Sequence, residues 1–380
     1  MKKEQLTFKN GKFNIMLLGD LHEGLNYTQE SKNKSEDCYT LIRKALSELK
    51  PDLVVYMGDI TGADNVDDYR KAIKEVVAPC VEANVPFSFV YGNHDREHGV
   101  DLKTQMGLFQ EYENCYAFND DETVSGYGNH NLLIKSSDGK RDILNLWFID
   151  SNNLTDNHDN SYYDWVHDDQ IAWYENKSAE ITKNNGGKII PAVLFQHIPV
   201  PEEYELLRAA KPFERFWAAR GHHKWSDRLY VPCTGVEGYL GEGPCAPCVN
   251  NGQFDSWKKT GDVKAAFFGH DHMNDFAGYV DGILLGQCKT AGFKVYTDGC
   301  NSGVRMVTVD ETNPEDIQTR MYNFKKDFKL KSKSLGLYQR HVHDRQDINI
   351  KTGLAAFGAV AGTVAVGTAV KKIRSFLKQR

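Results

Sequence analysis

Short apolar runs recur along the chain, and most of them end in a glycine or a polar residue. Runs of this kind are typical of β-strands that are covered on both faces. They lie at residues 13–19, 52–58, 86–92, 143–150, 189–196 and 263–269. Between the early runs, apolar residues recur with helical spacing, which predicts amphipathic helices. The two clearest faces are formed by Leu41, Ile42, Ala45, Leu46 and Leu49, and by Tyr69, Ala72, Ile73, Val76 and Val77.

The alternation of strands and helices predicts an α/β fold in which at least some strands pair in parallel. Two later apolar segments, at 282–286 and 303–309, follow without an intervening helix. We therefore expect either one mixed sheet or two sheets packed face to face.

Polar residues with metal-binding side chains follow five of the apolar runs. In open α/β sheets, ligands bind at the carboxyl ends of the strands. The side chains are carboxylates, an amide and imidazoles, which suit Mn, Fe or Zn better than a cysteine-based structural zinc site does. Each motif alone also fits an ordinary turn. Their common placement predicts one site that contains Asp20, His22, Asp59, Asn93, His94, Asp95, His197, His270 and His272.

The order of these motifs resembles that of the calcineurin-like metallophosphoesterases. The resemblance extends from residue 13 to about residue 310, and the segments 146–151, 195–203 and 250–276 are similar to the branch related to purple acid phosphatases. It implies a four-layer αββα sandwich of mixed sheets, with a binuclear metal site at the carboxyl ends of the strands.

The resemblance implies two divalent metal ions, which would be Mn, Fe or Zn. The first ion would be held by Asp20, His22 and His272. The second would be held by Asn93, His197 and His270. Asp59 would bridge both ions, and a shared carboxylate would lower the repulsion between two dications about 3.5 to 4 Å apart.

The implied reaction is phosphoester hydrolysis, with a metal-bridging hydroxide attacking phosphorus in line. We expect a phosphomonoesterase, a phosphatase that acts on a phosphorylated substrate. A phosphodiesterase or nucleotidase of the same superfamily is one alternative. A catalytically silent binding or scaffold protein that retains the fold is another. Since all seven ligand positions are present, the sequence favours an active enzyme.

His94 is not required as a ligand if Asn93 is one. The resemblance implies that His94 faces the phosphate and protonates the leaving oxygen as a general acid. We expect the carboxylate of Asp95 to orient His94, with Asp64 and Asp150 as alternative partners.

The chain departs from the purple acid phosphatase pattern at two positions. That pattern has Asp-x-Gly in the first motif and a tyrosine three positions after the bridging aspartate. This chain has His22 and Gly62 there. We therefore predict no tyrosinate–iron absorption band and a metal pair such as Mn, Zn or Fe(II).

The charge distribution divides the chain into an acidic body and a basic tail. Residues 325–380 hold thirteen Lys or Arg and three Asp, a net charge of +10, so the total of −6 leaves −16 for residues 1–324. An acidic body argues against binding of extended nucleic acid. The eight cysteines are scattered, and the N-terminal apolar run is too short for a signal peptide. Both features predict a cytoplasmic protein with reduced thiols.

Three segments follow from this division: a catalytic domain at 1–324, a basic linker at 325–353, and an apolar Ala/Gly-rich tail with a basic end at 354–380. As a helix, the uncharged part of the tail, 354–370, would span about 26 Å, which is the lower limit for crossing a bilayer. Its basic flanks would favour an anionic membrane surface. The alternatives are a helix docked on the body and a tail that binds nothing. Two insertions, 96–141 and 201–251, fall at the active edge and are expected to set specificity.

Overall fold

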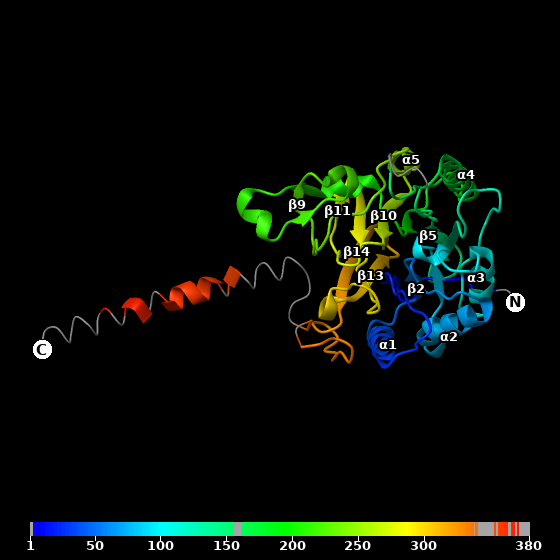
Figure 1. The fold of residues 1–380 in the computed structure, drawn as a ribbon. Coiled ribbons are helices and arrows are strands. Elements are labelled where there is room, and N and C mark those ends of the chain that lie inside the picture. The colour runs from blue at the N-terminus through cyan, green and yellow to red at the C-terminus, as the bar shows by residue number, and fades with distance from the viewer. Residues whose placement is uncertain are drawn as a thin grey trace, which may run out of the picture.

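The computed structural model describes residues 3–155, 161–337 and 339–340, and in the tail 353–354, 356–363, 366–368 and 371. Two β-sheets lie face to face, with helices on both outer sides (Figure 1). The first sheet has the order β14-β13-β1-β2-β3. Its strands are β1 (Lys12–Leu18), β2 (Leu53–Tyr56), β3 (Phe87–Phe89), β13 (Gly303–Asp310) and β14 (Asn313–Asn323).

The second sheet has six strands in the order β11-β12-β10-β6-β5-β4. They are β4 (His130–Lys135), β5 (Asp142–Phe148), β6 (Ala192–Gln196), β10 (Val263–Phe268), β11 (Ala277–Val280) and β12 (Ile283–Gln287). Both sheets are mixed. β1, β2 and β3 pair in parallel, as do β5, β6, β10 and β12, while β13, β14, β4 and β11 join their neighbours in antiparallel pairs.

Three buried apolar clusters hold the layers together. Residues from the inner faces of both sheets, such as Ile15, Val55, Phe195 and Phe267, form the central cluster. A second cluster packs α1 (Gln29–Leu49), α2 (Val66–Glu82) and α3 (Leu102–Phe109) on the first sheet. A third packs α4 (Asp168–Asn184) and α5 (Gln253–Thr260) on the second sheet. The predicted four-layer αββα sandwich is confirmed.

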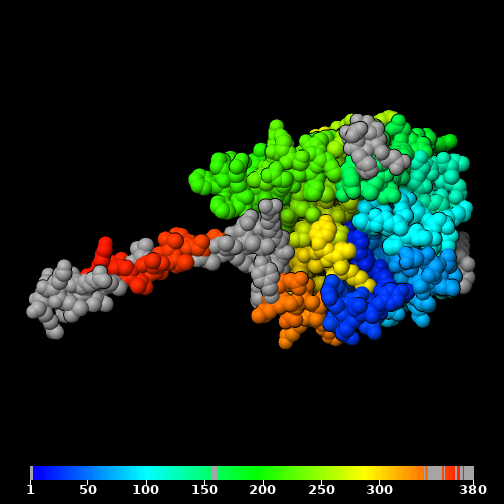
Figure 2. Space-filling view, viewed as in Figure 1, coloured from blue at the N-terminus to red at the C-terminus, as the bar shows by residue number. Residues whose placement is uncertain are grey.

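The second insertion forms a small sheet of its own. Strands β7 (Leu207–Ala209), β8 (Ala219–Arg220) and β9 (Leu229–Pro232) pair in the order β7-β9-β8. This unit projects from the side of the sandwich in both the ribbon and the space-filling views (Figure 1, Figure 2). This small sheet is therefore an addition to the two-sheet sandwich and belongs to neither of its sheets.

The segment after β14 packs against the body. Phe328 and Leu335 are buried in the helix-side cluster. The carboxylate of Asp37 on α1 accepts hydrogen bonds from the hydroxyls of Ser332 and Ser334, both at 2.6 Å. Residues 325–337, which the sequence predicts to be part of a linker, therefore pack as part of the body. The proposed domain boundary at residue 324 stays a prediction.

The tail is only partly described. Its described helical residues, 356–363, expose Phe357 and Val360. Among the described residues, no helix has the length and apolar content needed to cross a membrane. Residues 341–352 and 372–380, with several positions between them, lie outside the described residues.

Phe195 provides a test of the central cluster. Its fully buried ring lies between Phe148, at 5.2 Å between ring centroids, and Phe267, at 6.4 Å. Phe195→Ala should lower the free energy of unfolding by about 3–5 kcal/mol, since it leaves a cavity between two rigid sheets. Urea unfolding measures this loss. The exposed Tyr279→Ala serves as the control and should change stability by less than about 0.5 kcal/mol.

Candidate metal centre

The carboxyl ends of five strands meet at one edge of the sandwich. Strands β1, β2 and β3 of the first sheet, and β6 and β10 of the second, lead directly into the predicted motifs. Four of the candidate ligands adopt positive φ angles: Asp20 at 47°, His22 at 45°, Asp59 at 48° and His270 at 72°. Such a backbone is uncommon for residues with side chains and is concentrated at functional sites. The loops therefore direct these side chains toward one another, and the strained backbone conformation costs free energy of folding.

The first group of side chains consists of Asp20, His22, Asp59 and His272, whose candidate ligand atoms all lie within 4.8 Å of one another. His22 Nε2 is 3.2 Å from His272 Nε2 and 3.5 Å from Asp59 Oδ2. His272 Nε2 is 3.7 Å from Asp20 Oδ1. This spacing leaves room for one cation among the four side chains.

The second group contains Asp59, His197 and His270, with the same spacing. His197 Nε2 lies 3.3 Å from Asp59 Oδ2 and 3.2 Å from Asn93 Oδ1. Asp59 belongs to both groups, as a bridging ligand would. The structure thus brings all seven predicted ligand residues together, while their coordination of metal stays a prediction.

Three buried atoms in this cluster have no hydrogen-bond partner: Asp20 Oδ2, Asp59 Oδ2 and His270 Nε2. An unsatisfied buried polar atom costs about 1–3 kcal/mol. Oxygen and imidazole donors suit Mn, Fe or Zn, and a cation would satisfy these atoms at once. The residues present therefore fit a pair of divalent ions.

The pKa values of the histidines determine which of them can bind a metal without losing a proton. Burial lowers the pKa of His22 to about 4 and that of His272 to about 3, so both imidazoles are neutral and keep a free lone pair. Burial alone would also lower the pKa of His197, but the Asp59 carboxylate outweighs it and raises this pKa to about 10. A metal would have to displace the His197 proton, which makes metal affinity dependent on pH.

Hydrogen bonds from the other ring nitrogens orient the ligand histidines. His197 Nδ1 donates to the carbonyl oxygen of Met57 at 2.8 Å, which links the two sheets. His272 Nδ1 donates to the carbonyl oxygen of Tyr296, also at 2.8 Å, and its ring stacks on the Tyr296 ring at 4.1 Å. Because the tautomer is set this way, each Nε2 is left to face the centre.

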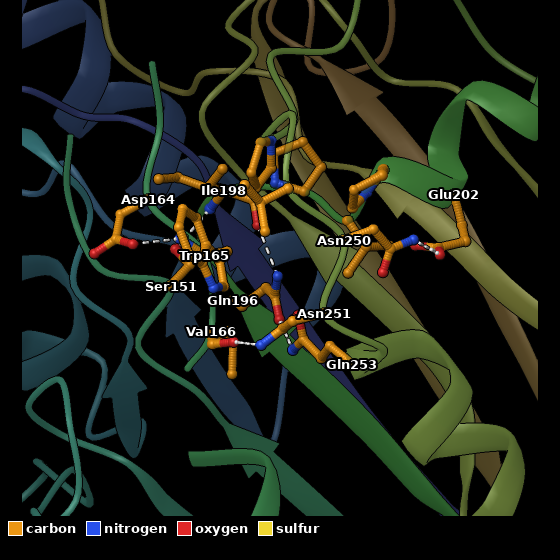
Figure 3. Close-up of a pocket in the computed structure, with 15 residues that line it drawn as sticks. Ser151, Asp164, Trp165, Val166, Gln196, Ile198, Glu202, Asn250, Asn251 and Gln253 are labelled. Carbon is orange, nitrogen blue, oxygen red and sulfur yellow. Dashed lines mark hydrogen bonds between the residues drawn. The ribbon is translucent and has the colours of Figure 1, made fainter. Parts of the chain in front are cut away.

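A polar network supports the loop that carries His197 (Figure 3). The Ile198 backbone N–H donates to Ser151 Oγ at 2.9 Å, and Gln196 Nε2 donates to the Ile198 carbonyl oxygen at 2.7 Å. Gln253 Nε2 in turn donates to Gln196 Oε1 at 2.7 Å. The cavity among these groups holds about 10 Å³, enough for one water and too small for a substrate. The network positions the ligand loop.

His94 lies at the rim of the centre, with its side chain about half exposed. Its backbone N–H donates to Asp59 Oδ1 at 2.9 Å, and its ring is edge-on to the His22 ring at 5.2 Å. The partner of its side chain is Glu97, whose Oε2 is 2.7 Å from His94 Nδ1. Sequence analysis missed Glu97, although its spacing of three residues within a short helical turn was visible.

The expectation that Asp95 orients His94 is wrong. The buried Asp95 carboxylate instead accepts hydrogen bonds from the backbone N–H groups of Ile60, at 2.9 Å, and Gly92, at 2.8 Å. Burial, with the nearby Asp59, raises the pKa of Asp95 to about 7. Asp95 therefore ties together the two loops that carry Asp59 and Asn93. Of the alternatives, Asp150 pairs with Arg96, and Asp64 lines a cavity beside His22.

Two tyrosines that sequence analysis did not single out extend the rim. The Tyr163 ring is perpendicular to the His270 ring at 4.5 Å. Tyr162 stacks on His223, from the second insertion, at 5.2 Å. An aromatic residue in a loop gives no sequence signal for a place at the rim, because only the folded chain brings Tyr163 to His270 and Tyr162 to His223.

An acidic cluster backs the last motif. Asp271, between the two ligand histidines of that motif, accepts a hydrogen bond from the Cys245 backbone N–H at 3.1 Å. Gln287 Nε2 donates to both Asp271 Oδ2, at 3.0 Å, and Glu203 Oε2, at 2.7 Å. The loop with the Cys-x-x-Cys sequence thus braces the metal motif, and its two cysteines are free thiols.

The chain is similar to several known proteins. A family model described as calcineurin-like phosphoesterase matches residues 13–274. Probable inactive purple acid phosphatase 14 of Arabidopsis thaliana is 27% identical over 321 residues, covering 77% of this chain and 74% of that protein. Probable inactive purple acid phosphatase 29 of the same plant is 28% identical over 334 residues, covering 81% and 80%. The crystal structure of a dimetal phosphatase from Danio rerio is 14% identical, covers 82% of this chain and 99% of its own, and has a TM-score of 0.45.

Asp59 provides a test of the shared ligand position. Asp59→Asn should weaken binding of both ions by about 10–100-fold or more, since even the loss of an outer-shell partner has an effect of that size. Metal content after equilibration with Mn²⁺, measured by inductively coupled plasma mass spectrometry, reports the loss. Asp67→Asn, an exposed carboxylate on α2, is the control. Equal metal content in the two variants would refute the bridging role.

Glu203 provides a test of the acidic cluster through pH. Burial raises its pKa from 4.5 to about 8. The neutral form therefore contributes stability that is fully present below 4.5 and is lost as the pH rises through about 8. Glu203→Gln should remove this loss, so its free energy of unfolding should rise relative to wild type by about 2–4 kcal/mol between about pH 5 and about pH 9. Urea unfolding at both pH values measures it. The exposed neighbour Glu205→Gln should follow wild type, and a Glu203 variant that does the same contradicts the prediction.

Proposed function

Because this chain belongs to the calcineurin-like phosphoesterase family, whose model matches residues 13–274, we propose that it is a metal-dependent phosphatase that hydrolyses phosphomonoesters. One observation carries the proposal: two groups of ligand side chains share Asp59 and enclose buried atoms that lack any hydrogen-bond partner. The relatives named above are called purple acid phosphatases, which favours a phosphatase among the reactions of the family, although both names carry the words "probable inactive".

The candidate ligands form two groups, one for each proposed ion. Asp20, His22 and His272 would hold one ion, and Asn93, His197 and His270 the other, with Asp59 shared. When bound, a pair of divalent ions supplies Lewis-acid charge that activates water and neutralises charge on the phosphoryl oxygens. Burial of the ligand cluster keeps this charge in a low-dielectric setting, where it acts more strongly than in water.

His94 is the group best placed to move a proton at the leaving oxygen. Its ring lies against that of His22 and is open to solvent on the other side, so it can reach a bound ester. The Glu97 carboxylate accepts the hydrogen bond from Nδ1–H and so holds the ring with Nε2 free to face the leaving oxygen. Glu97 is therefore a positioning residue, and His94 the general acid.

A catalytically silent binding protein is the alternative, because two of the relatives carry the words "probable inactive" in their names. In this chain, however, every expected ligand position is retained. Hydrolysis by the metal-stripped protein, resupplied with Mn, Zn or Fe(II), decides between the two. Turnover of p-nitrophenyl phosphate supports the phosphatase, preference for bis(p-nitrophenyl) phosphate indicates a diesterase, and no turnover with two ions bound favours the silent protein.

The general acid has its own test. His94→Asn should lower kcat for p-nitrophenyl phosphate by about 100-fold or more, the usual scale for loss of a general acid. Metal content should be unchanged, since the His94 side chain lies outside both ligand groups. A p-nitrophenol absorbance assay measures kcat, and metal analysis of the same samples measures metal content. Asp59→Asn serves as the comparison variant that is expected to lose metal. Full turnover in metal-replete His94→Asn would exclude the proposed role.

A further inference from the structure

A cavity of about 330 Å³ opens beside the first ligand group. His22, one of the candidate ligands, forms part of its wall. The other lining residues come from the loops after β1 and β2, from the starts of α1 and α2, and from the segments after β3 and β12. His22 also contacts the ring of His94. His22 therefore borders both the cavity and the general-acid candidate His94.

Gly62 and His98 shape the wall of the cavity. A Cβ atom on Gly62 would lie only 1.8 Å from His98 Nε2, so the imidazole occupies the space of any side chain at residue 62. This is the position at which the purple acid phosphatase pattern has a metal-binding tyrosine. In this chain the wall carries instead an exposed imidazole that reaches it from the segment after β3.

The charges in the cavity are compensated at all but one acidic position. The Lys294 ammonium lies 3.2 Å from Glu23 Oε2 and donates to the Gly24 carbonyl oxygen at 3.0 Å. Asp68 is paired with Lys71 at 2.8 Å. Asp64 has no ion pair or side-chain hydrogen bond among the described residues. The cavity therefore presents one uncompensated carboxylate, which attracts a positively charged hydrogen-bond donor.

We propose that this cavity binds the leaving group of the substrate, and that this leaving group is a small amino alcohol whose ammonium contacts Asp64. The inference rests on the proposed phosphatase function and assigns a substrate class to it. The phosphate would lie at the metal centre, the leaving oxygen near His94, and the carbon chain along His22 toward Asp64. Asp64 is thus a specificity residue.

Binding of phosphonates tests the inference without any turnover, because their P–C bond is not hydrolysed. The Mn²⁺-loaded protein is titrated in a calorimeter with ω-aminoalkylphosphonates of two to five carbons and with the alkylphosphonates of equal length. At the chain length that reaches Asp64, the amino compound should bind about fivefold more tightly, the scale of one partly exposed hydrogen bond between charged groups. Asp64→Asn should reduce this ratio to about one, and the matched surface variant Asp67→Asn should keep it.

The outcomes separate the inference from the proposed function. Equal affinities for amino and plain phosphonates at every length, or no phosphonate binding at all, overturn the inference. A preference that survives in Asp64→Asn overturns it too. If the preference is present and depends on Asp64, but the corresponding amino alcohol phosphates are not hydrolysed, the ammonium site at Asp64 stands, and the phosphatase function that would make its occupant a leaving group is wrong.

Discussion

The close packing of the two sheets is the constraint on which the candidate site depends. The inner faces meet through a dry apolar cluster, and no ligand group is complete within one sheet. At Gly269, just before the last motif, a Cβ atom would lie 2.7 Å from the Met57 carbonyl oxygen, so only glycine allows the loops of the two sheets to approach this closely. The hydrogen bond from His197 to the same carbonyl oxygen then fixes the distance between them.

This packing also determines the charge state of the cluster. Burial makes charged imidazoles costly, and the pKa values of His22 and His272 are lowered accordingly. Two buried carboxylates remain, Asp20 and Asp59, each with an oxygen that lacks a hydrogen bond. The fold thus concentrates buried carboxylate oxygens without hydrogen bonds at one point, where divalent cations would satisfy them.

The surroundings of the centre show how one scaffold is specialised. The common layers supply the strand ends, while the two insertions and the loop between β5 and α4 supply the rim. Glu97 lies beside His94, Tyr163 lies against His270, and His223 stacks on Tyr162. Gly62 and the His98 imidazole that lies over it form one wall of the cavity beside His22. Loops on a rigid frame can change in this way without disturbing the ligands.

The sequence by itself determined the layered α/β class and the gathering of the metal-capable side chains at one sheet edge, because apolar runs mark buried strands and the polar motifs follow them directly. The choice of seven ligands among these side chains came from the family resemblance of the motifs. The side-chain partner of the exposed His94 could not be found in this way. Asp95 has a sequence position as suitable as that of Glu97, yet its side chain is buried against the backbone of Ile60 and Gly92, while that of Glu97 reaches His94. The cavity beside His22 likewise depends on where the His98 loop lies in space. Local pattern specifies which residues end a strand; only tertiary packing decides which side chains from distant loops come into contact.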